Sequence, residues 1–271
     1  GASAGDVIIG TTLSSGGTTM IDSTRDATLA STTSAGAVTV TAVGATMATL
    51  LKSNAAITAT SGSMNLTNVD AGSALSLTSN NGALTVATGK SGTTSELKTV
   101  AAGGTDVSVT TALTSGQGTT ITSRGNARLA SVTATTGDMV VNALTGEVTG
   151  VGAGAANLEA TAGKVTVNGG ARARLGTVKS GSDLSVTADA INVASANVSG
   201  AMSLIADVGN ALLDTGIVTG TSLLQAPGNV TVGNLQSGGT ATLSAGGTAS
   251  ATTIVQTTSA GAAINVTGGT L

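Results

Sequence analysis

The side chains that carry most enzyme chemistry are scarce in this sequence of 271 residues, which contains no His, Cys, Phe, Tyr or Trp. Without His and Cys, the usual ligand sets for zinc, haem and iron-sulfur clusters are missing, as are the Ser-His-Asp and Cys-His nucleophile systems. The 13 acidic residues are scattered and nominate no catalytic pair. We therefore expect a protein that is not an enzyme and that uses no metal and no cofactor.

Two short motifs and one pair of carboxylates could suggest catalysis. Residues 1–5 match the nucleophile pattern G-x-S-x-G, which requires a His partner that this chain lacks. Ser95 and Lys98 match S-x-x-K, but in a strand an offset of three places two side chains on opposite faces. Asp183 and Asp189 could meet across a turn, and we interpret them as solvated carboxylates.

Basic residues gather in one part of the sequence. Lys164, Arg172, Arg174 and Lys179 lie close together, and no Lys or Arg follows Lys179. The two-residue spacing of Arg172 and Arg174 places both on one face of a strand, where they could form a fork for a sulfate or carboxylate. We expect these four residues to contact an anionic glycan. The alternative is a protruding, solvated corner.

Four triplets match the acceptor pattern for N-glycosylation, and their asparagines are Asn65, Asn197, Asn229 and Asn265. In a chain so rich in Ser and Thr, such triplets also arise by chance. The four asparagines are candidate modification sites.

The charge and hydropathy of the chain bear on its partners. It has 10 Lys and Arg against 13 Asp and Glu, a formal net charge of -3. Nucleic-acid binding is disfavoured, because phosphate contacts need dense basic residues. No apolar run approaches the roughly 20 residues of a transmembrane helix. The sequence begins without a signal segment, and we interpret it as a mature protein or an excised piece of a longer one.

The strands that carry these residues can be predicted from a repeat in the sequence. Units of 19 or 20 residues begin at a recurrent Gly or Ala, and the unit starts fall at 17, 36, 55, 74, 94, 117, 137, 156, 181, 200, 220, 239 and 261. The long units, 94–116, 156–180 and 239–260, are interpreted as units with insertions at turns. A fixed period of this length is typical of stacked repeats.

Within a unit the apolar residues alternate with small or polar ones. The pair Leu184 and Val186 is followed by Ile191 and Val193, and then by Val198. Three short strands, each with one buried face, account for this pattern. The sequence therefore predicts a right-handed parallel β-helix of about 20 residues per rung and about 12 to 13 rungs, a single repeat domain over residues 1–271. A narrow lumen filled by stacked Val, Leu, Ile and Ala explains the missing aromatic residues.

Other repeat architectures fit less well. A leucine-rich repeat needs the pattern L-x-x-L-x-L-x-x-N, and a calcium-binding roll needs G-G-x-G-x-D, and neither recurs here. Rows of Thr, such as Thr39 and Thr41 beside Thr58 and Thr60, could suggest an ice-binding face, but the next unit breaks the row with Ser76.

The segments SDLSVTADAINVASANVSGAMSLIAD (182–207) and GNVTVGNLQSGGTATLSAGG (228–247) resemble the 19-residue repeats of filamentous haemagglutinin-like adhesins, which are two-partner secretion exoproteins. The resemblance runs from about residue 17 to residue 271. It implies a secreted, surface-associated shaft that is exported through an outer-membrane transporter and meets host or neighbouring cells. The family's amino-terminal secretion domain, with its Asn-Pro motifs, has no counterpart, since the single proline is Pro227.

We therefore expect a rigid extracellular shaft of a bacterial adhesin, without a recognisable cap in this sequence. The alternative is an extracellular filament subunit that stacks end to end, because uncapped strand edges present unpaired N-H and C=O groups.

Overall fold

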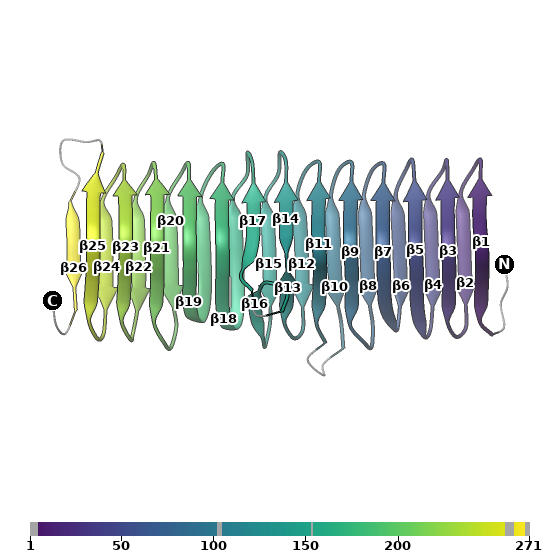
Figure 1. Ribbon diagram of the computed structural model, residues 1–271, viewed down its shortest axis with the longest axis horizontal. Coiled ribbons are helices and arrows are strands. Elements are labelled where there is room, and N and C mark those ends of the chain that lie inside the picture. Colours follow the sequence, from purple (N-terminus) through teal and green to yellow (C-terminus); the bar gives the residue numbers. More distant parts are fainter. Residues whose placement is uncertain (1–4, 102–104, 153, 258–262, 269–271) are drawn as a thin grey trace.

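The computed structural model describes residues 5–101, 105–152, 154–257 and 263–268, and in this part of the chain every regular element is a β-strand. All paired strands run parallel, and they stack into a right-handed β-solenoid of about 13 turns with a spacing of about 19 residues. At roughly 4.8 Å per turn the stack is about 60 Å long. Figure 1 shows the strands side by side along a straight rod, with β1 and β26 at opposite ends.

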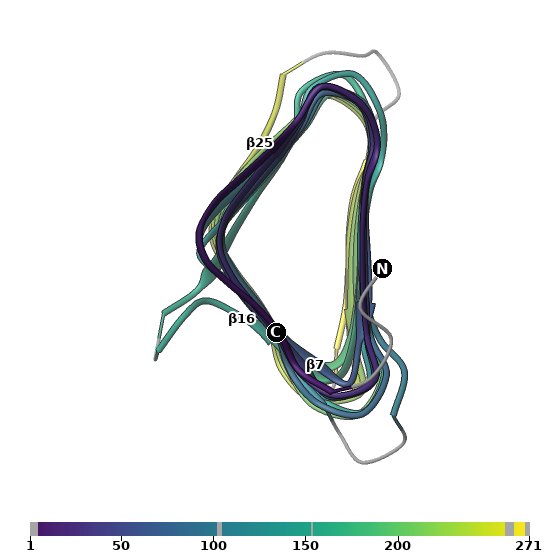
Figure 2. The same ribbon diagram turned by 90° about the vertical axis from the view of Figure 1, so that its right-hand side faces the viewer.

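Viewed along the rod, each turn is a triangle with three flat faces (Figure 2). The first face is built by short strands: β2 (Thr19–Ser23), β4 (Val38–Ala42), β6 (Ile57–Ser61), β8 (Leu75–Ser79), β10 (Ser95–Thr99), β12 (Thr119–Ser123), β15 (Met139–Ala143), β20 (Met202–Ala206), β22 (Ser222–Ala226), β24 (Ala241–Ala245) and β26 (Ile264–Thr267). The opening residues of β18 (Val165–Ser180) and β19 (Leu184–Val198) continue this face.

The second and third faces are the two halves of longer strands that bend at a corner. These strands are β1 (Val7–Ser15), β3 (Ala27–Ser34), β5 (Ala45–Ser53), β7 (Ser63–Ala71), β9 (Leu84–Ser91), β11 (Val107–Ser115), β21 (Ala211–Val218), β23 (Val230–Ser237) and β25 (Ala249–Gln256). In two turns the halves are separate strands: β13 (Ala127–Leu129) with β14 (Ser131–Ala134), and β16 (Glu147–Thr149) with β17 (Ala156–Ala160). The expectation of three strand segments per turn is confirmed, and in most turns the second and third segments are halves of one bent strand.

The core is a set of aliphatic ladders inside the tube. One ladder on the first face pairs equivalent residues of successive turns: Ala59, Leu77, Leu97, Ile121, Val141, Val167, Val186, Leu204, Leu224 and Leu243. Each is at most 1% exposed. The predicted inward residues Leu184, Ile191, Val193 and Val198 are buried as well. Apolar surface is thus buried turn against turn, without a central core.

Inward-facing serines stabilise the corners. The Ser79 hydroxyl, at the end of β8, shares its proton between the carbonyl oxygens of Gly62 in the preceding turn (2.9 Å) and Gly82 in its own (2.7 Å). Ser180 does the same at another corner, with Gly163 at 3.2 Å and Asp183 at 2.7 Å. These hydroxyls satisfy buried polar groups where the chain changes direction.

Asp and Asn side chains tie successive corners together. Asn210 Oδ1 accepts a hydrogen bond from the backbone N-H of Asn229 in the next turn at 2.7 Å, and a Cβ at Gly228 would collide with that oxygen. Asp26 relates in the same way to Gly44 and to the N-H of Ala45. A carboxylate or amide followed one turn later by Gly therefore forms a recurring corner lock.

One unit boundary expected from the sequence is wrong. Ala156–Ala160 does not start a turn: this strand lies on the third face, between β14 and the end of β18, and the next turn starts at Val165. The insertion in this region is the loop between Thr149 and Ala156, one face earlier than expected. The inserted residues of the units 94–116 and 239–260 lie between β10 and β11 and between β25 and β26, partly outside the described residues.

Candidate ligand-binding groove

Arg172 and Arg174 lie side by side on the outside of the second face. Both are exposed on β18, while Ala173 between them is buried in the tube. The expected two-residue spacing on one strand face is confirmed. Glu147 of the preceding turn approaches Arg172 Nε to 3.9 Å.

The other two basic residues lie elsewhere on the solenoid. Lys179 is on the third face, where its ammonium group is 3.6 Å from the Glu159 carboxylate. Lys164 lies in the corner before the first face, and its backbone N-H donates to Asp138 Oδ1 at 3.0 Å. Residues that are close in the sequence are spread around the triangle, so the structure brings together only the two arginines of the expected group.

Two cavities in the second face share Arg172 and Arg174. The larger, of about 530 Å³, extends toward the C-terminal turns and is lined by Asn192, Asn210, Leu212, Asn229 and Thr231 among others. The smaller, of about 160 Å³, lies on the N-terminal side and is lined by Asn126, Arg128, Glu147, Thr149, Gly152 and Gly154. We call the two cavities together the arginine groove.

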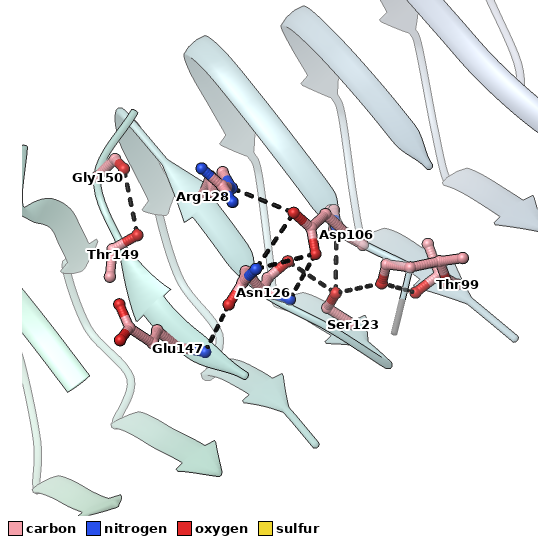
Figure 3. A network of polar contacts seen from close by, with 10 residues as sticks. Thr99, Asp106, Ser123, Asn126, Arg128, Glu147, Thr149 and Gly150 are labelled. Atoms are coloured by element: carbon pink, nitrogen blue, oxygen red, sulfur yellow. Dashed lines mark hydrogen bonds and ion pairs between the residues drawn. The ribbon is translucent and has the colours of Figure 1, made fainter. Parts of the chain in front are cut away.

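A network of hydrogen bonds holds the N-terminal end of the groove (Figure 3). Asp106 accepts bonds from the Asn126 N-H at 2.8 Å and from Arg128 Nε at 3.1 Å. Asn126 Oδ1 in turn accepts the Glu147 N-H at 2.9 Å, which carries the network across three successive turns. Because Arg128 is paired with Asp106 and Arg172 with Glu147, the acidic groups of this end offset part of its positive charge.

The loop after β16 adds a wall to the same end. Figure 2 shows it standing out from the triangular outline. Gly152 has φ of 67°, a left-handed conformation that Gly adopts without a steric penalty, and the Gly150 N-H donates to the Gly154 carbonyl at 3.2 Å.

The four candidate glycosylation asparagines are all exposed. Asn65, Asn197 and Asn265 lie in strands β7, β19 and β26. Asn229 lies in the corner before β23 and lines the arginine groove, where its Oδ1 accepts the Thr248 N-H at 2.9 Å. Modification at these four sites stays a prediction.

The remaining catalytic motifs do not assemble. Ser95 is buried and Lys98 is exposed on β10, so the expected placement on opposite faces is confirmed. Asp183 and Asp189 flank the first-face part of β19, about 20 Å apart along extended chain, so the idea that they meet across a turn is wrong. The motif at residues 1–5 lies almost wholly outside the described residues.

The described residues were compared with the requirements of a metal site and of a membrane-spanning helix, and they meet neither. They contain no group of three or more Asp or Glu side chains placed to hold a metal ion. They also contain no helix long and apolar enough to cross a membrane.

Asn192, Asn210 and Thr231, which line the groove beside the arginines, were not predicted from the sequence. Asn192 pairs with Arg174 across one turn, and Leu212 and Thr231 continue the same ladder. The signal that could have found them is the period itself, since residues one turn apart share a face.

No known protein family, curated protein or solved structure matches this chain in sequence or fold comparison. The assignment of a role therefore depends on the geometry and on the repeat pattern.

Proposed function

We propose that the chain is a rigid extracellular shaft of a bacterial filamentous adhesin, which mediates or presents attachment to host or neighbouring cells. The observation that carries the proposal is the unbroken stack of about 13 parallel turns, in which the described residues form one rod rather than a globule. The resemblance of the 19-residue repeats to haemagglutinin-like exoproteins supplies the bacterial surface setting. On this proposal a two-partner outer-membrane transporter exports the chain.

The construction of the rod suits a spacer. Each turn contacts only its neighbours, so length can be added one turn at a time without redesigning a core. Strands β1 and β26 lie at opposite ends of the rod (Figure 1). A binding domain joined to one end would therefore be held away from a surface joined to the other end. The chain has 23 Asp, Glu, Lys and Arg residues among 271, so its outer surface carries few charges. Such a surface suits contact with neutral or weakly charged surfaces.

The proposal is tested on cells of the organism that makes the protein. Antibodies raised against the purified chain should label intact, unpermeabilised cells or filaments around them, and their Fab fragments should reduce attachment to other cells. Labelling that appears only after lysis, or attachment that Fab fragments leave unchanged, contradicts the proposal. Fibres that form from the purified chain in proportion to its concentration would instead support the self-assembling filament.

A further inference from the structure

The arginine groove is a surface feature that a spacer does not need. Its two cavities meet at Arg172 and Arg174 and run along the rod, across successive turns rather than along one strand. The larger cavity, about 530 Å³, falls within the size range of small-molecule binding sites.

Positive charge in the groove is confined to one place. Among the residues that line the larger cavity, Arg172 and Arg174 are the charged ones, and the others are Asn, Thr, Gly and aliphatic residues. In the smaller cavity Glu147 and the Arg128 partner Asp106 offset positive charge. The site therefore suits a ligand with a single anionic group, since a polyanion would find no further cations along the larger cavity.

The C-terminal part of the groove offers a neutral amide in each of the three turns after the arginines. Asn192 follows Arg174 by one turn, and Asn210 and Asn229 follow at the corner of the next two turns. The Oδ1 atoms of Asn210 and Asn229 are held by backbone N-H groups, which fixes the position of their Nδ2 donors. Three turns of the rod span about 14 Å.

Amide donors in successive turns beside a guanidinium fork match the hydrogen-bonding groups of a sugar chain. Arg binds a carboxylate through two parallel N-H···O bonds, and Asn and Thr side chains bind hydroxyl groups. We infer that the arginine groove binds a short oligosaccharide lengthwise, with one sugar carboxylate at Arg172 and Arg174 and neutral sugars along Asn192, Asn210 and Asn229. This inference goes beyond the role of a shaft and does not depend on it.

The test is a titration of the purified chain, followed by calorimetry or NMR, with oligosaccharides of equal length. The set contains a neutral chain, one with a single uronate, one with a single sulfate and a polysulfated heparin fragment. We expect the single-uronate chain to bind at least tenfold more tightly than the neutral one. Equal binding of the two, preference for the polysulfated fragment, or no binding at millimolar concentration overturns the inference.

Variants separate the groove from general electrostatics. The double variant R172Q/R174Q should lose at least tenfold in affinity for the single-uronate chain. The matched control K164Q/K179Q removes the same charge from other parts of the surface and should bind like the parent. Asn192→Ala should weaken binding of the oligosaccharide but not of free glucuronate. Equal losses in the two double variants contradict a groove-specific site.

The titration uses no cells, so its failure leaves the shaft proposal intact. Failure of the cell labelling likewise leaves the proposal of the groove intact.

Discussion

Each strand residue in this solenoid faces either the inside or the outside of the tube. Leu204 is fully buried between the equivalent residues Val186 and Leu224 of the adjacent turns. Ile217, of similar size, points outward and is 48% exposed. The same chemical change at the two positions should therefore have different costs.

Leu204→Ala should lower the free energy of unfolding by about 2 to 5 kcal/mol, because it leaves a cavity between two turns. Ile217→Ala should cost clearly less, since its side chain is already half in water. Urea unfolding followed by circular dichroism measures both. Equal losses in the two variants would mean that the register of the strands is different.

Ser79→Ala should cost about 1 kcal/mol, the net contribution of a typical hydrogen bond, because it removes the buried hydroxyl that bonds Gly62 and Gly82. Ser76→Ala is the matched control, on the same strand but facing outward. The midpoint of urea unfolding should shift for the first variant and stay near that of the parent for the second. An equal shift in both would show that the corner hydroxyl is not a stabilising group.

At the scale of the element, strands were easier to predict than corners. The alternation of apolar and small residues is the same on all three faces, so it locates strands without telling which face each belongs to. For this reason Ala156–Ala160 reads as the start of a turn, while the pairing with β14 places it on the third face. The loop between Thr149 and Ala156 shifts the position of the next turn along the sequence. The alternation of residues does not reveal the length of this loop.

The candidate site could likewise be predicted within one strand but not across corners. The two arginines lie on one strand, where local alternation is sufficient to place them together. Lys164 and Lys179 lie across corners, where nearness in the sequence says nothing of the face. The asparagines of the groove come from later turns: Asn192 is found by counting one period from Arg174, and Asn210 and Asn229 by counting two and three periods from Arg172.

Corner locks make a specific prediction about glycine. Gly228→Ala should cost about 1 to 3 kcal/mol, because its Cβ would displace Asn210 Oδ1, leave the Asn229 N-H without its partner and lie 2.7 Å from the Gly209 carbonyl oxygen. Gly17→Ala should be nearly neutral, since nothing lies within 4 Å of a Cβ at that position. Thermal unfolding of the two variants measures the difference, and similar melting temperatures would contradict the lock.

At the scale of the whole molecule, missing aromatic residues and low charge fit one explanation. A narrow tube of stacked aliphatic ladders needs no rings, and its stability is a sum of local contacts between turns. Length is then the property that can vary freely.

Deletion of residues 57–94, which removes two complete turns, should leave a folded protein that is shorter by about 10 Å. The new junction joins Ala56 to Ser95, so that β10 takes the place of β6 beside β4. The circular dichroism signal per residue should stay unchanged. A loss of β-structure would show that the turns are not interchangeable.

The most direct test of the rod uses the absence of cysteine in the native chain. Spin labels at Thr39→Cys and Thr242→Cys occupy one ladder of the first face, separated by ten successive strand pairings. Pulsed electron paramagnetic resonance should give a narrow distance distribution centred near 48 Å, and near 29 Å when the second label is at Thr166→Cys. A broad distribution, or two distances that do not scale with the number of turns, would contradict a rigid shaft.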